Sequence, residues 1–102
     1  WGTESDKDEL ENIYKQAQTW SIENNIPVTV NEFGAAKFDF TAPENVCELD
    51  ERLQYLESHV EFATEYGISA TFWDDAGSFS TYDRATGEWG PEKDILVAPN
   101  LP

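Results

Sequence analysis

The stretch that decides the fold is IPVTVNEFGA, residues 26–35. Val28 and Val30 are separated by a threonine, and the segment then reaches Asn31 and Glu32 before a glycine turn. This alternation predicts a β-strand in which Val28, Val30 and Glu32 share one face. Neither face is plainly polar before the strand ends, so we expect both faces to be covered, as in a parallel sheet. The strand therefore delivers a carboxylate at its carboxyl end.

An amphipathic helix is expected on each side of this strand. In residues 5–25, Ser5 is a good N-cap with Asp8 as its capping partner. The apolar stripe of this first helix consists of Leu10, Ile13, Ala17 and Trp20. Residues 42–67 form the second expected helix, which Gly67 should terminate. Its apolar positions, again three or four residues apart, are Val46, Leu49, Leu53, Leu56, Val60 and Ala63.

A second strand and a hairpin complete the expected order of elements. ISATFWDD, residues 68–75, is rich in β-forming residues and ends in two aspartates. GSFSTYDRATGEWG, residues 77–90, predicts two short arms around DRATG. The proline-rich tail, residues 91–102, leaves room for a short helix at best. The strand–helix–strand part predicts a right-handed βαβ unit within one α/β domain, residues 1–102.

Composition and charge restrict the classes of partner. The 102 residues are 39% hydrophobic and 14% aromatic, which is typical of a chain that folds. Their net charge is −15, from 21 acidic and 6 basic residues. Such a charge repels nucleic acids and anionic membranes, and no apolar run approaches the ~20 residues that span a bilayer. We therefore expect no nucleic-acid or membrane partner, and an extracellular protein with a neutral partner.

Two single residues exclude further classes of site. Cys47 is the only cysteine, so no disulfide forms within the chain, and we expect it to be a small buried residue of the second helix. His59 is the only histidine, which excludes Cys/His metal sites and a catalytic triad. We expect no cofactor and no metal. Arg52 is expected to pair with Glu48 one turn away on the second helix.

Acidic and aromatic residues collect where the two expected strands end. The first strand ends in Asn31-Glu32 and the second in Trp73-Asp74-Asp75. In parallel α/β sheets, reactive groups lie at these carboxyl ends. Sugar rings stack on indole, and a carboxylate stabilises oxocarbenium-like charge. A solvated loop carboxylate and a tryptophan of the core remain open alternatives, and the spacing of the aspartates is a weak match to a calcium loop.

A longer series of motifs resembles a known family. The series begins with IPVTVNEFGA and continues with LDERLQYLESHVEFATEYGISATFWDDAGSFSTYDRATGEW. In this order, the motifs resemble the C-terminal part of glycoside hydrolase family 5 endo-β-1,4-glucanases (cellulases). The resemblance implies a (β/α)8 TIM barrel that hydrolyses β-1,4-glucan with retention. Residues 1–102 would then correspond to the region of strands seven and eight, with about two parallel strands, two helices and the hairpin.

The same resemblance implies roles for individual residues. Glu32 occupies the position of the family's catalytic nucleophile, and Trp73 that of the tryptophan that stacks on the sugar beside the scissile bond. Asn31 stands where the family usually has glycine, and we expect it to orient groups near the site. The remaining candidates for substrate binding lie around these residues on the rim: Asp74, Asp75, Phe79 and Trp89.

One half of the family's catalytic machinery is missing from the sequence. The acid/base glutamate of the family sits in an Asn-Glu-Pro motif, whereas Asn31-Glu32 is followed by Phe33. Retaining hydrolysis needs two carboxyl groups ~5 Å apart. The resemblance therefore implies a glucan-binding fragment that is inactive alone. The alternatives are an endoglucanase completed by oligomerisation or by other barrel segments, and an inert folding fragment.

A partial barrel should also associate with other chains. We expect the strand faces of Val28, Val30, Ala70 and Phe72 to stay partly open, along with two sheet edges. Such a chain should associate with copies of itself or with the missing barrel segments, and symmetry favours a homo-oligomer. The sequence begins at Trp1 with neither an initiator methionine nor a signal peptide. We therefore expect either a processed protein or a piece of a longer one.

Overall fold

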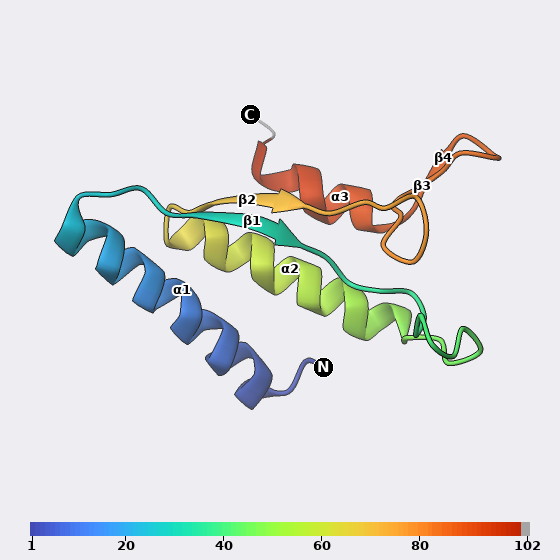
Figure 1. Cartoon of the computed structure of the whole chain (residues 1–102), viewed down its shortest axis with the longest axis horizontal. Helices are drawn as coiled ribbons and strands as arrows, with labels where there is room; N and C mark the ends of the chain where they lie inside the picture. The colour runs from blue at the N-terminus through green and yellow to red at the C-terminus, as the bar shows by residue number, and fades with distance from the viewer. Residues whose placement is uncertain (101–102) are drawn as a thin grey trace.

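The computed structural model describes residues 1–100. Two parallel strands, β1 (Thr29–Phe33) and β2 (Ser69–Phe72), are joined by helix α2 (Leu49–Glu65), and helix α1 (Glu4–Asn24) precedes them. A hairpin of β3 (Tyr82–Asp83) and β4 (Glu88–Trp89) follows, and then come α3 (Glu92–Val97) and a 3-10 turn, Ala98–Asn100. Figure 1 shows α1 and α2 below the strands and the hairpin beyond the strand ends. The predicted α/β order and the short C-terminal helix are confirmed; residues 101 and 102 of the tail lie outside the described part.

One extra residue in β1 sets the register of the parallel pair. Val30 pairs with Ala70 and Phe33 pairs with Phe72, so three steps along β1 match two along β2. This β-bulge falls at Asn31 and Glu32. Without it, the two-residue period of a strand would place Glu32 on the same face as Val30. With it, Phe33 takes that face instead.

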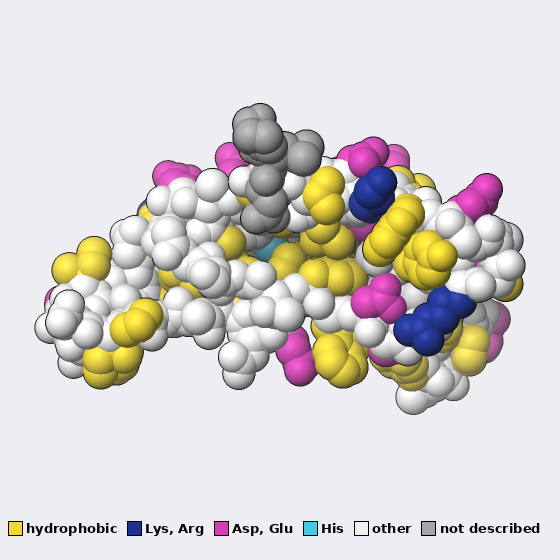
Figure 2. Space-filling view, turned by 90° about the horizontal axis from the view of Figure 1, so that it is seen from above, with side chains coloured by type: hydrophobic (Ala, Val, Ile, Leu, Met, Phe, Trp, Pro, Cys, Tyr) yellow, Lys and Arg dark blue, Asp and Glu magenta, His cyan; other side chains and the backbone are white. Residues whose placement is uncertain are grey.

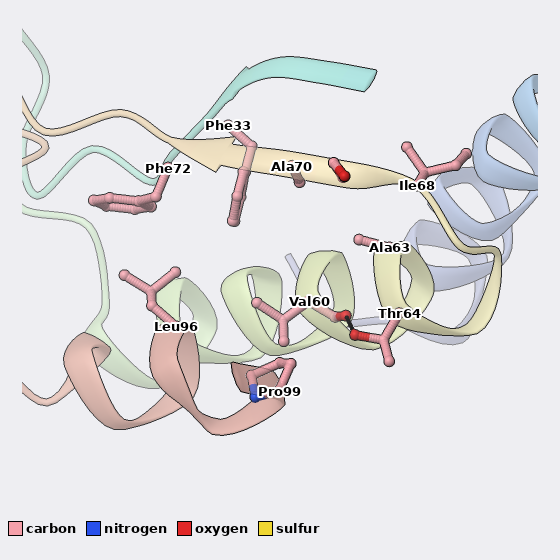
Figure 3. A pocket seen from close by; sticks show the side chains of 10 residues that line it. Phe33, Val60, Ala63, Thr64, Ile68, Ala70, Phe72, Leu96 and Pro99 are labelled. Atoms are coloured by element: carbon pink, nitrogen blue, oxygen red, sulfur yellow. Dashed lines mark hydrogen bonds between the residues drawn. The ribbon is translucent and has the colours of Figure 1, made fainter. Parts of the chain in front are cut away.

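The helix-facing side of the sheet carries the apolar strand residues. Val30 packs against a cluster of Tyr14, Ala63 and Ile68 from α1, α2 and the start of β2. Phe33 and Phe72 contact edge to face, with ring centroids 5.7 Å apart. Figure 3 shows Phe33, Ala70 and Phe72 directed toward α2 and α3 across a pocket of about 310 Å³. Ala70 is nonetheless exposed and Val28, Val30 and Phe72 are only half-buried, so these residues stay partly open as predicted, but on the helix side of the sheet.

The opposite side of the sheet is open and polar. By strand alternation and register it carries Thr29 and Asn31 from β1 and Ser69 and Thr71 from β2, all of which are exposed. The expectation of a strand covered on both faces is not met within the described residues.

The chain is less compact than a closed monomer of its size. Its Cα radius of gyration is 14.9 Å, against roughly 13 Å for a compact chain of this length. The accessible area is 6937 Å², against about 5,800 Å² for a compact monomer of this mass.

The N-cap of the first helix lies two residues before the predicted one. Thr3, not Ser5, is the N-cap: its Oγ1 accepts from the Asp6 backbone N–H at 3.2 Å, and the Asp6 carboxylate accepts in return from the Thr3 N–H at 2.9 Å. Leu10 and Ala17 pack against the core as predicted. Ile13 and Trp20 are 63% and 49% exposed, so half of the predicted stripe is largely open to solvent.

The second helix begins seven residues later than the predicted start. Backbone bonds from Cys47 N to Lys37 O (2.9 Å) and from Asp39 N to Asn45 O (3.0 Å) fold residues 37–47 back on themselves instead. Asp39 Oδ1 closes this loop by accepting from Thr41 N at 2.7 Å. Cys47 consequently lies outside the helix and is exposed, contrary to the expectation of a buried residue. The predicted end is right, because Gly67 follows α2 with a φ of +64°.

A buried aromatic cluster joins α1, α2 and β1 around the only histidine. The His59 ring stacks on Phe33 with centroids 5.0 Å apart and meets Tyr55 edge to face at 4.5 Å. Its Nδ1 lies 2.9 Å from the Tyr14 hydroxyl. Burial lowers the pKa of His59 from 6.5 to about 4 and raises the pKa of Tyr14 to about 12. Both groups are therefore neutral at pH 7, which suits a hydrogen bond from the phenol to the imidazole.

We predict that His59 makes the free energy of unfolding depend on pH between 6.5 and 4. The unfolded imidazole takes up its proton near pH 6.5 and the folded one only near pH 4, so stability falls as pH drops through this window. The full effect is at most about 3 kcal/mol. Urea unfolding at pH 7 and pH 4, compared with His59→Gln, isolates it from the carboxylates. Equal losses in both proteins would contradict the prediction.

A buried ion pair fixes α3 to α2. The Arg52 guanidinium pairs with a carboxylate oxygen of Glu92, and the two side chains are only 11% and 3% exposed. The predicted partner Glu48 was wrong, because α2 begins only at Leu49 and Arg52 turns toward α3. Within the described residues, Arg52 Nε and Glu92 Oε2 have no hydrogen-bond partner, so the pair is not fully satisfied.

We predict that Arg52→Met destabilises the protein by about 3–5 kcal/mol, because Glu92 would be left buried without its counter-charge. The double variant Arg52→Met/Glu92→Leu should recover most of this loss, since no uncompensated charge remains. Urea unfolding monitored by far-UV circular dichroism measures both. A single variant as stable as the double variant would show that the pair does not hold α3.

Candidate functional site

The bulge in β1 places the predicted nucleophile on the open face. Glu32 is exposed, while Phe33, the next residue, is buried against His59. Asn31 is also exposed, and these two residues together occupy the place opposite Thr71 alone. By strand alternation and the bulge, the carboxylate belongs to the side of the sheet opposite the helices. That position suits a group that reacts with a bound ligand.

A backbone hydrogen bond holds Trp73 beside the end of β1. Its N–H donates to the Phe33 carbonyl at 2.8 Å, which extends the β1–β2 ladder one residue past β2. The Trp73 side chain is 46% exposed. The structure thus brings Glu32 and Trp73, predicted from two separate strands, to the same end of the sheet. A carboxylate and an indole that share one rim can contact one sugar unit between them.

Phe79 supports the rim from beneath. A Cβ on Gly34 would lie only 2.9 Å from the Phe79 ring, so any larger residue at this position would force the ring to shift. The same ring packs on Phe40 with centroids 5.8 Å apart. Phe79 is half-buried. These contacts connect the loop after β1 to the loop after β2.

Ser78 is a connection that sequence reasoning missed. It is 1% exposed, and its Oγ accepts from the backbone N–H groups of Lys37 and Phe38 at 3.2 and 3.3 Å and donates to Phe38 O at 3.1 Å. Its carbonyl accepts from Lys37 N at 2.8 Å. One small side chain thus fastens the two strand-end loops together. A serine in a Gly-Ser-Phe-Ser run gives no local signal of this, because its partners lie about 40 residues away.

Asp74 and Asp75 organise the loop that follows Trp73. Asp74 accepts from Ala76 N at 2.8 Å and from both the N–H and the hydroxyl of Thr81 at 2.9 Å. The hydrogen bond from the Thr81 backbone is the main cause that lowers the pKa of Asp74 below its usual range. Asp75 Oδ1 accepts from Gly77 N at 2.7 Å and Phe79 N at 2.9 Å. Among residues 1–100, no group of three or more His, Cys, Asp and Glu side chains is placed to hold a metal ion.

Trp89 lies on the hairpin, away from the β1–β2 rim. It is 58% exposed and packs across the hairpin on Tyr82, with ring centroids 4.8 Å apart. Figure 1 shows β3 and β4 projecting beyond the end at which β1 and β2 finish. The hairpin predicted from the sequence is therefore present, and it leaves a large aromatic surface open to solvent.

Comparison with known families now adds to this geometry. The family model described as Cellulase (glycosyl hydrolase family 5) matches residues 1–78. The chain belongs to glycosyl hydrolase family 5. It is 37% identical over 88 residues to Endoglucanase 3 of Fibrobacter succinogenes, a match that covers 86% of this chain and 12% of that protein. Endoglucanase H of Acetivibrio thermocellus is 28% identical over 84 residues, which are 82% of this chain and 8% of that protein.

Solved structures agree on the fold. A hyperthermophilic endo-β-1,4-glucanase in complex with substrate superimposes with a TM-score of 0.79 over 96% of this chain and 29% of that chain, at 24% identity. Thermotoga maritima Cel5A in complex with mannotriose gives 0.77 over 96% and 29%, at 26% identity. The chain is thus a family 5 TIM-barrel segment, and it spans less than a third of the family 5 proteins it matches. Its described residues do not close into a barrel.

We predict that Gly34→Ala destabilises the protein by about 1–3 kcal/mol, because the new methyl group displaces the Phe79 ring. Gly77→Ala is the matched control: a Cβ there meets only ordinary contacts at 3.4 Å, and its effect should stay within about 0.5 kcal/mol. Urea unfolding measures both. Equal effects at the two glycines would show that the contact between Gly34 and Phe79 is unimportant.

Proposed function

We propose that this chain is the β-1,4-glucan-binding C-terminal part of a retaining family 5 endoglucanase, and that residues 1–102 contribute its seventh and eighth strand units. In this proposal Glu32 is the nucleophile and Trp73 stacks on the sugar beside the scissile bond. Asn31 orients the ligand, and Asp74, Asp75 and Phe79 complete the rim, chiefly by holding its loops. The observation that carries the proposal is the bulge that turns Glu32 to the open face next to Trp73.

The isolated chain lacks the general acid that retaining hydrolysis needs. That acid must be protonated at working pH, so its pKa should be raised. Of the two aspartates that follow β2, Asp74 is the one next to Trp73 in the sequence. Its pKa is lowered, however, and its carboxylate already accepts three hydrogen bonds. It therefore stays ionised and cannot protonate a leaving oxygen. We assign the acid to barrel segments outside these residues.

The proposed ligand is a neutral polysaccharide met outside the cell. A net charge of −15 does not repel an uncharged glucan, whereas it would repel an anionic polymer. No helix within residues 1–100 is both long and apolar enough to cross a membrane. Because Thermotoga maritima Cel5A has been solved with mannotriose as well as cellobiose, β-1,4-mannan belongs among the ligands to be tested.

The decisive experiment separates binding from hydrolysis. We expect the chain to bind cellotetraose without cleaving it, with Glu32→Gln binding about as well as wild type and Trp73→Ala weakened by about three- to tenfold. Trp20→Ala, which removes an exposed tryptophan from α1, is the matched control and should leave affinity unchanged. Titration followed by NMR and a reducing-sugar assay measure the two properties. If the wild-type chain cleaved cellotetraose faster than Glu32→Gln does, the chain would itself be catalytic.

We further propose that the chain associates with copies of itself. Among the described residues, Ala70 is exposed, β1 and β2 each keep one unpaired edge, and Ile13 and Trp20 are exposed on α1. Light scattering should therefore give a mass that is a multiple of 11.6 kDa at micromolar concentration. A mass of 11.6 kDa that does not change with concentration would refute this proposal.

A further inference from the structure

A second pocket, with a volume of about 480 Å³, lies in the hairpin rather than on the rim. Residues of the loop after β1, the loop after β2 and both hairpin arms line it. Two of its side chains are aromatic and four are charged: Tyr82, Trp89, Lys37, Asp83, Arg84 and Glu88. Neither Glu32 nor Trp73 lines this pocket.

The aromatic pair is more open than a purely structural pair needs to be. Tyr82 and Trp89 face each other in register, and their rings are tilted by 52°. Cross-strand aromatic pairs of this kind stabilise a hairpin by mutual contact. Trp89 nevertheless keeps 58% of its surface exposed, and Tyr82 keeps 36%. An indole face that is open beside a polar pocket suits stacking of a sugar ring.

The polar groups of the pocket include both hydrogen-bond donors and acceptors. Lys37 and Arg84 donate, and Asp83 and Glu88 accept. Lys37 Nζ contacts Ser80 Oγ at 3.2 Å, while neither Arg84 nor Glu88 forms a side-chain hydrogen bond or ion pair with any residue in the range 1–100. Hydroxyl groups need both kinds of partner, whereas an anion needs only donors. Figure 2 shows hydrophobic, basic and acidic side chains mixed at the end of the molecule that carries the hairpin.

The pocket also lies where a bound chain could extend from the rim. The hairpin projects past the ends of β1 and β2, the end at which Glu32 and Trp73 lie (Figure 1). Lys37 follows β1 and Ala76 follows β2, so both rim loops continue into the lining of the pocket. The fastening of these loops by Ser78 keeps the pocket and the rim in a fixed relation.

We propose that the hairpin pocket is an outer subsite for a neutral pyranose unit of the same β-1,4-linked chain, with Trp89 as its stacking surface. The ligand class rests on the proposed function, but the site itself is separate from Glu32 and Trp73. A long oligosaccharide would contact both places, whereas a disaccharide would contact one. The hairpin thereby adds affinity for polymer over short sugars.

Indole N–H signals in a ¹H–¹⁵N NMR spectrum test this directly, because each of the four tryptophans gives its own signal. We expect cellohexaose to shift the signals of Trp73 and Trp89 and to leave Trp20 unmoved, since Trp20 lies on α1. Maltohexaose, which is α-1,4-linked, is the control ligand. Movement of Trp73 without Trp89 supports the proposed function and overturns the outer subsite. Movement of Trp89 without Trp73 supports the subsite and counts against the proposed function.

Substitution of Trp89 separates stacking from hairpin stability. Trp89→Phe keeps a flat ring and Trp89→Leu keeps only an apolar contact with Tyr82. We expect Trp89→Leu to weaken the binding of cellohexaose by about three- to tenfold, and Trp89→Phe to weaken it by a smaller factor. The Gly87 amide signal reports whether the turn, closed by its bond to Asp83 O at 2.8 Å, is intact. Equal affinity of wild type and Trp89→Leu with an intact turn would overturn the proposal, as would unmoved signals of both Trp73 and Trp89.

Discussion

The β-bulge at Asn31 and Glu32 is the constraint on which the rest of the structure depends. One extra residue between Val30 and Phe33 lets both of these apolar side chains lie on the helix side of the sheet. The same strand still presents the Glu32 carboxylate on the opposite side. A regular strand with Val30 in the core would bury Glu32 beneath the sheet, where an unpaired carboxylate is costly. The aromatic stacking of Phe33 on His59 supplies the packing that holds the bulge in place.

Beyond the bulge, the candidate site is maintained by its loops rather than by its strands. β1 and β2 are short, and the ladder between them ends with the bond from Trp73 N to Phe33 O. Beyond this bond, polar side chains hold the loops in place. Asp74 and Asp75 accept hydrogen bonds within the loop after β2, and Ser78 joins that loop to the loop after β1. Phe79 fills the space that Gly34 leaves between them. The rim is therefore positioned by hydrogen bonds that are satisfied within the two loops, whatever covers the open face.

The chain combines a small core with an open sheet. Among the described residues, the buried apolar ones are Tyr14, Phe33, Leu56, Ala63 and Ile68. A core of this size provides little stability beyond the cost of ordering the chain. The buried pair of Arg52 and Glu92 and the neutral bond between Tyr14 and His59 consequently connect elements that the core alone does not. The open face of the described residues is polar, with Thr29, Asn31, Ser69 and Thr71 exposed on it.

The sequence by itself determined the order of elements, the hairpin, the end of α2 at Gly67, and Glu32 and Trp73 as residues of one rim, because these depend on local periodicity, turn residues and chain order. Tertiary structure alone decided which face of β1 is buried, because the bulge changes the two-residue period that the prediction assumed. It also decided the late start of α2, the partner of Arg52 and the role of Ser78. Each of these depends on a contact about 10 to 40 residues away in the chain, which no local pattern of residue types records.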